Sequence, residues 1–151
     1  MAVLLALHVL AAVIWVGGMF FAYMVLRPSA GPLESASRLA LWQRVFGRFF
    51  PWVWASIAVL LISGYSILFL RFGGFQAAPP HIHVMQATGI LMMLLFLYLY
   101  FAPWRRFSRA VETGVLQDAA ASLNQIRRIV ATNLVLGLVT VAAGASGRFW
   151  S

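Results

Sequence analysis

Four apolar runs, each long enough to cross a lipid bilayer, constrain the fold of this chain more than any other feature. A transmembrane helix needs roughly 20 consecutive, mostly apolar residues. In lipid, only helices and closed barrels satisfy their own backbone hydrogen bonds. The sequence therefore predicts an all-α fold, a four-helix transmembrane bundle that forms a single domain over residues 1–151. The expected spans are about residues 3–26, 52–70, 82–101 and 129–146.

The charged residues are few and almost all basic. Of the chain, 63% is hydrophobic and only 9% is charged, and the net charge of +8 comes from eleven arginines against three acids. Arginines that flank apolar spans anchor helices at the interface and set topology, so we expect the lipid bilayer as partner and no nucleic acid. Because the chain has no cysteine, disulfides, thiolate metal sites, iron–sulfur clusters and covalently attached haem are excluded.

Nine of the eleven arginines lie in two segments between spans, residues 27–50 and 102–128. The positive-inside rule places these segments in the cytoplasm. We therefore expect a multi-pass protein of the bacterial inner (plasma) membrane, with both termini periplasmic. Within them, residues 33–50 and 103–124 are amphipathic. The first forms either a surface helix, which could bind lipid or a second copy in a homodimer, or an extension of the second span.

The first and third spans resemble each other when shifted by 75 positions. This shift superposes His8 on His83, Tyr23 on Tyr98 and Pro28 on Pro103, three residue types that are scarce here. We interpret the match as two parallel two-helix repeats. His8 precedes the first arginine by about 28 Å of helix, which is one hydrocarbon thickness. His8 and His83 are therefore expected at equal depth near the outer surface.

Two histidines at equivalent depth predict a shared cofactor. Helical bundles hold cofactors with inward-facing side chains on opposed helices, so we expect haem b between spans one and three, with His8 and His83 as axial ligands. Ala12 and Ala87, one turn from each histidine, leave room for a flat macrocycle. The remaining residues predicted to bind the cofactor are Trp15 below His8 and two arginines on the outward side, Arg71 and Arg148, for the propionates. The alternative role of these arginines is interfacial anchoring.

Three further residues are weaker candidates for the cofactor site. His81 lies about 200° around the helix from His83, so it is expected to face the loop, solvent or a cofactor edge. Asn133 and Gly137 share one face of the fourth span. Small residues at such spacing indicate close helix packing, and the alternative is that this stripe lets the cofactor or a quinone approach the backbone.

Copper is the main competitor of haem. Imidazole and thioether groups bind Cu(I) where cysteine is absent, so His8 and His83 could hold copper together with Met19 or Met85. A second alternative is a structural or assembly subunit with merely interfacial histidines. Hydrolase chemistry is unsupported, because the chain has neither a nucleophile–base pair nor paired carboxylates. If the chain is an enzyme, we expect a membrane oxidoreductase.

Several motifs resemble the copper-resistance protein D family, in its small four-span branch. The similar segments are His8-Val9-Leu10, Trp15 to Phe20, Arg27-Pro28, His83 to Ala87, Tyr100 to Pro103, Ile126 to Arg128 and Asn133 to Gly137. The resemblance covers nearly the whole chain. It implies an inner-membrane helical bundle with a role in copper uptake or tolerance.

A more distant similarity is to the four-span, haem-binding membrane oxidases that convert protoporphyrinogen to protoporphyrin. That family carries a histidine in span one and a His-Val-Lys motif in span three. Here His8 and His83-Val84 match, but Met85 stands where the family has lysine. The resemblance implies haem binding by the two histidines, with protoporphyrinogen oxidation as a further alternative. The main prediction is a small b-type cytochrome-like protein that transfers one electron at the periplasmic side, between quinone and a periplasmic redox partner.

Overall fold

The computed structural model describes residues 1–150, with the exception of the Arg148 side chain, so the prediction made for Arg148 lies outside the described part. Every regular element in that part is helical. Four helices are long and apolar enough to cross a membrane. These findings confirm the predicted all-α, four-helix membrane fold. The four helices are Ala2–Ser29, Ser35–Phe72, Pro80–Glu112 and Leu116–Ser146.

Two of the long helices are uninterrupted and two contain a widened turn. The uninterrupted ones are α3 (Ser35–Phe72) and α6 (Leu116–Ser146). The first helix consists of α1 (Ala2–Phe20), a π-helical turn η1 (Phe21–Leu26) and α2 (Arg27–Ser29). The third consists of α4 (Pro80–Leu99), a π-helical turn η3 (Tyr100–Trp104) and α5 (Arg105–Glu112). Short 3₁₀ turns, η2 (Phe75–Ala77) and η4 (Gly147–Phe149), precede α4 and follow α6.

Each π-helical turn accompanies a proline. Pro28 follows η1 closely, and Pro103 lies inside η3. Proline has no N–H and its ring clashes with the carbonyl four residues earlier, and a wider turn with one extra residue relieves that clash. As a result both helices continue past their prolines. The same distortion therefore occurs in the two helices that the 75-residue shift relates.

The basic segment before the second span is part of that span's helix. Of the two alternatives for residues 33–50, the structure has the extension, because α3 runs unbroken from Ser35 to Phe72 with Pro51 inside it. The chain reverses at Gly73 and at Gly114, whose φ angles of 70° and 73° are left-handed. Glycine adopts this conformation without steric cost.

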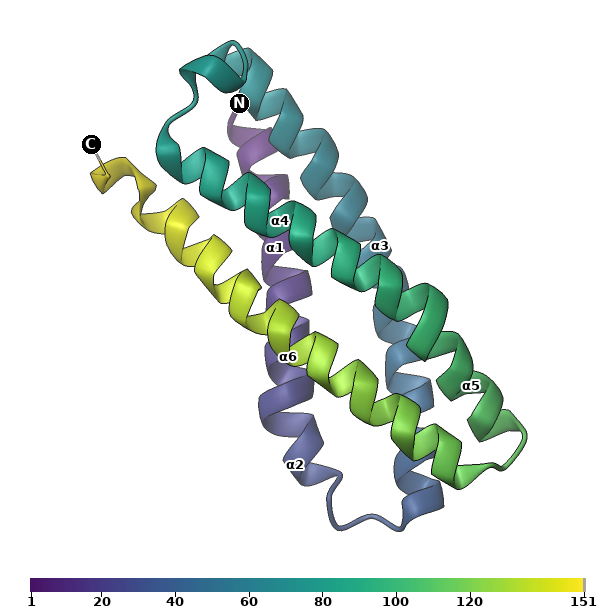
Figure 1. The fold of residues 1–151 in the computed structure, drawn as a ribbon. Helices are drawn as coiled ribbons and strands as arrows, with labels where there is room; N and C mark the ends of the chain where they lie inside the picture. Colours follow the sequence, from purple (N-terminus) through teal and green to yellow (C-terminus); the bar gives the residue numbers. More distant parts are fainter. Residues whose placement is uncertain (151) are drawn as a thin grey trace.

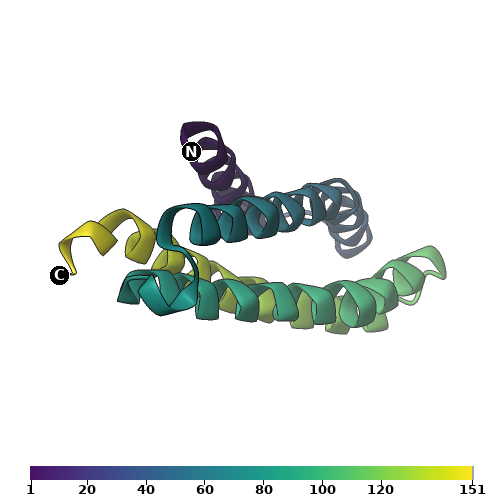
Figure 2. The same cartoon turned by 90° about the horizontal axis from the view of Figure 1, so that it is seen from above.

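The four helices form two antiparallel pairs. α1 packs on α3, and α4 packs on α6 (Figure 1). Seen from above, α4 and α6 lie side by side in one layer, α3 lies over them, and the first half of α1 projects away from both (Figure 2). The pairs meet where α1 crosses α6. There a Cβ on Gly137 would lie only 2.9 Å from Cγ2 of Val16, so glycine is what permits the crossing.

The two ends of the bundle differ in packing. We call the end that holds residues 27–50 and 102–128 the arginine-rich end, and the opposite end, with both chain termini, the terminal end. Aromatic rings fill the arginine-rich half, where Phe50 lies 5.1 Å from both Phe46 and Trp104 between ring centroids. Buried side chains are sparse near the terminal end. There apolar residues of α1, such as Val9, are exposed and suited to contact lipid.

Candidate functional site

His8 is held by α3 near the terminal end of the bundle. Its Nδ1 lies 2.8 Å from Oγ of Ser63. Ser63 donates its own hydroxyl proton to the carbonyl of Val59, 2.6 Å away and one turn back. The serine oxygen is therefore left to accept, and Nδ1 of His8 carries the proton. This tautomer leaves a lone pair on Nε2, and the backbone carbonyl of Leu60 also lies within hydrogen-bond reach of the ring.

The next residue of α3 makes room for the ring. A Cβ on Gly64 would lie 3.1 Å from Cε1 of His8 and 3.6 Å from Nδ1. Ser63 and Gly64 together fix the position and the tautomer of the imidazole. Sequence reasoning missed both residues. The signal that could have found them is a polar residue beside a glycine in an apolar span, a pattern typical of close helix contacts.

The helix face below His8 points into the protein. Ala12 is half-buried, and Trp15 and Met19 are only 2% and 3% exposed. The Trp15 ring packs edge-on against Phe96 of α4, with 6.2 Å between the ring centroids. Trp15, which was predicted to lie beside the cofactor, thus contacts protein side chains on its inward face.

The corresponding face of α4 points outward. His83 and Ala87 are exposed, and Ile90 and Leu94 follow them at 41% and 57% exposure. No hydrogen bond or ring contact joins His8 and His83 among residues 1–150. The two histidines that the repeat relates thus differ in exposure, and their joint role as ligands stays a prediction.

His81, in contrast, packs on η4, the turn that follows α6. Its ring occupies the space that a Cβ on Gly147 would need, and it meets the indole of Trp150 edge-on at 6.3 Å. Its Nδ1 is buried and has no hydrogen-bond partner in the described part of the chain. His81 therefore lies against the turn that follows the fourth helix.

Polar and small residues line the contact between α4 and α6. Asn133 donates from Nδ2 to the carbonyl of Met92 at 3.1 Å, and its Oδ1 is buried without a partner among the described residues. The hydroxyl oxygens of Thr88 and Thr140 lie 2.6 Å apart. Near the terminal end, Met85 packs its thioether on Gly144, where a Cβ would lie 3.0 Å from Cε and 3.2 Å from the sulfur. Small residues on α6 thus receive the side chains of α4.

The remaining candidates lie apart from His8. Arg71 ends α3 with its guanidinium 5.6 Å from the centroid of the Phe72 ring. No group of three or more His, Cys, Asp or Glu residues that could hold a metal occurs in the part of the chain that the structure describes. A metal at His8 would therefore need other ligands, such as thioethers.

Comparison with known proteins gives one match. A family model described as copper resistance protein D matches residues 43–146. This region covers α6 and α4 completely and all of α3 after its first eight residues. No curated protein matches the chain, and no solved structure does.

Proposed function

Because this chain belongs to the copper resistance protein D family, we propose that it binds Cu(I) within the membrane and that His8 is a ligand of the metal. The role that follows is copper uptake or tolerance. Cu(I) prefers imidazole and thioether ligands when thiolates are absent, and the chain has six methionines and no cysteine.

The observation that carries this proposal is the hydrogen bond between His8 and Ser63. A ligating histidine usually donates its second ring N–H to a fixed acceptor, which sets the tautomer and the ring orientation. Ser63 is such an acceptor, since its own proton goes to Val59. The imidazole is thereby presented as a neutral ligand through Nε2 before any metal arrives.

Met85 is the thioether that we assign as a second ligand. Its thioether packs on Gly144 of α6 near the terminal end, the end of the bundle that also holds His8. Met19 is the poorer candidate. It is buried in the core and lies eleven residues from His8, about 16 Å along the helix.

The direction of copper movement follows from the arginines. The positive-inside rule places the arginine-rich end in the cytoplasm and the terminal end, with His8, at the outer surface. In this orientation His8 receives copper from outside the cell. A bacterial inner membrane with periplasmic termini is the arrangement that we propose.

Haem b binding and one-electron transfer, which the repeat predicts, remain predictions that neither the geometry nor the comparisons support. His8 lies on an inward face and His83 on an outward one. A protoporphyrinogen oxidase-like activity and a quinone or periplasmic redox partner likewise remain predictions without support from the geometry or the comparisons. An assembly subunit without metal is the outcome expected if neither haem nor copper binds.

The test is a Cu(I) titration of the purified protein in lipid nanodiscs, in competition with a chromophoric Cu(I) chelator. We expect the wild-type protein to withdraw Cu(I) from the chelator and His8→Ala to lose this ability. The matched control is His83→Ala, which removes the same side chain from an exposed position. Equal Cu(I) binding by wild-type protein and His8→Ala would overturn the assignment of His8. Sharp α and β bands in the dithionite-reduced visible spectrum of the same sample would show that the protein binds haem, and the copper assignment would then be wrong.

A further inference from the structure

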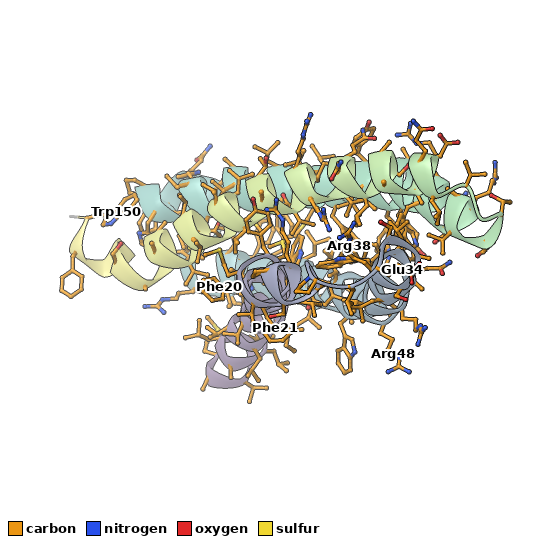
Figure 3. The ribbon with its side chains drawn as sticks, turned by 90° about the horizontal axis from the view of Figure 1, so that it is seen from below. Phe20, Phe21, Glu34, Arg38, Arg48 and Trp150 are labelled. Atoms are coloured by element: carbon orange, nitrogen blue, oxygen red, sulfur yellow. The ribbon has the colours of Figure 1, made fainter. Side chains whose placement is uncertain are left out.

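A cleft of about 360 Å³ lies at the arginine-rich end, between the first turns of α3 and α6. Ser35 and Arg38 of α3 line one side, and Leu116, Asn124 and Arg127 of α6 line the other. Figure 3 views this end and shows Arg38 between the two helices, whereas Arg48 of the same helix points away from the bundle. The cleft is far from His8, so what binds there is independent of copper.

The arginines of this cleft have no acidic partner. Arg38 donates to the carbonyl of Gly31 at 3.2 Å, and Arg127 reaches the side-chain oxygen of Asn124 at 3.5 Å. Two acids lie nearby in the chain, Glu34 just before α3 and Asp118 in the first turn of α6, but both are exposed, and neither lines the cleft. No ion pair joins an acid to Arg38 or Arg127 in the described structure.

Arg127 is the most confined of these cations. Its guanidinium lies 5.7 Å from the centroid of the Trp42 ring. Its Nε is buried with no acceptor among the described residues, as is the indole Nε1 of Trp42. The positive charges of Arg27 and Arg38 both act on it. Because a confined cation beside like charges is costly, this arrangement favours a bound anion.

Two helix N-termini add to the positive potential of the cleft. Ser35 is the first residue of the 38-residue α3, and Leu116 is the first residue of the 31-residue α6. Neither N-terminus is capped by a side-chain hydrogen bond. The first N–H groups of a helix lack intrahelical acceptors, and together with the helix dipole they attract anions. Ser35 and Leu116, the first residues of these helices, line the same cleft as Arg38 and Arg127.

We propose that this cleft binds a phosphate group. Guanidinium groups pair with phosphate through two parallel N–H···O bonds, and backbone N–H groups at helix N-termini also bind phosphate. The group can come from two sources, the headgroup of an anionic phospholipid or inorganic phosphate in solution. Apolar side chains line the same cleft, Leu39, Leu116 and Leu123, and they give the hydrophobic part of a lipid a place to contact.

The experiment has one arm for each source. In the first, protein is taken from nanodiscs that contain phosphatidylcholine and phosphatidylglycerol, and native mass spectrometry measures which lipid remains bound. In the second, protein in phosphatidylcholine nanodiscs is titrated calorimetrically with inorganic phosphate at constant ionic strength. Retained phosphatidylglycerol identifies a lipid site, and a phosphate isotherm identifies a site for the free anion.

The variants are Arg38→Gln and Arg127→Gln, and Arg48→Gln is the control with the same change of charge on an exposed residue of α3. Each cleft variant should weaken binding roughly tenfold to a hundredfold, the usual cost of one charge-assisted contact. Arg48→Gln should bind as the wild-type protein does. Arg38 lies outside the aromatic core, so Arg38→Gln stays informative if Arg127→Gln does not fold. The proposal is wrong if neither arm detects binding, or if Arg38→Gln and Arg48→Gln bind equally well.

Discussion

Asn133 of α6 donates a hydrogen bond to the backbone carbonyl of Met92 of α4, and both residues are buried at the centre of the bundle. This hydrogen bond links α4 to α6 in the buried interior of the bundle, where water cannot take the place of either partner. The other polar atom of Asn133, Oδ1, has no partner within residues 1–150. The contact is thus a specific link between helices rather than part of a polar pathway.

Replacing Asn133 by alanine should therefore loosen the contact between α4 and α6. We expect the free energy of unfolding to fall by about 0.6–1.7 kcal/mol, the range measured for hydrogen bonds between membrane helices. Reversible unfolding in mixed micelles measures this change. Asn124→Ala, an exposed position on the same helix, is the control and should be close to neutral. An Asn133→Ala protein as stable as wild type would show that the bond contributes nothing.

Gly137 should tolerate no larger residue, because a Cβ there would lie 2.9 Å from Val16 and 3.2 Å from Met92. We expect Gly137→Leu to cost about 1–3 kcal/mol through overpacking where α1 crosses α6. Thermal unfolding in detergent measures the loss. The matched control is Gly17→Leu, because a Cβ on Gly17 would meet nothing within 4 Å. Similar losses in the two variants would contradict a special role for the crossing.

Ser63 should tune copper binding without being a ligand. In Ser63→Ala the proton on Nδ1 of His8 loses the serine oxygen as acceptor, so the ring is held less firmly in the ligating tautomer. Loss of such a partner usually lowers metal affinity roughly tenfold to a hundredfold. The same chelator competition measures the affinity, and Ser66→Ala, one turn further along α3, is the control. Complete loss of binding would instead make the serine oxygen itself a ligand.

A larger side chain at position 64 should impair copper binding, because Gly64 makes room for the His8 ring. A side chain there would push against Cε1 of His8 and displace the ring from Ser63. We expect Gly64→Leu to lose Cu(I) binding while the protein stays folded, because few side chains are buried near the terminal end. Gly89→Leu, at a site where a Cβ would meet nothing within 4 Å, should keep it. Unchanged Cu(I) affinity in Gly64→Leu would argue that the position of the ring is unimportant.

The two candidate thioethers can be separated by exchanging methionine for leucine, which keeps the volume and removes the sulfur. Met85→Leu should lower Cu(I) affinity, whereas Met19→Leu should leave it unchanged. Leucine for methionine usually costs less than 1.5 kcal/mol in a core, so both proteins should fold. The reverse result, a loss confined to Met19→Leu, would move the metal from the terminal end to the centre of the bundle.

The sequence was sufficient to predict the fold because membrane insertion depends on long apolar runs, which are visible without a structure. The equal depth of the two histidines, inferred from the fixed rise along a helix, stays a prediction. The sequence did not predict the rotation of α4. Gly144 of α6 and Gly147 of η4 receive Met85 and His81, and this turns His83 toward the outside. Rotation depends on which side chain fits which gap in a neighbouring helix, and a repeat in one helix carries no information about that fit.

The partner of His8 was missed for a related reason. The repeat relates the first span, which contains α1, to the third span, which contains α4. In the structure α1 packs instead on α3, which is the second span. Ser63 and Gly64 are small residues in an apolar run. Their importance appears only when the histidine of another helix is placed against them. A search for small or polar residues in every span would have included them as possible contacts.

The concentration of aromatic rings in the arginine-rich half has a consequence for how the protein opens. Amide hydrogens exchange with solvent at rates set by local opening, and segments with few buried contacts open most readily. The bundle should therefore exchange as two unequal units, with protection highest around Phe46, Phe50 and Trp104 and lowest in the first turns of α1. The helix that carries His8 would thus lie in the part of the molecule that opens at the least cost.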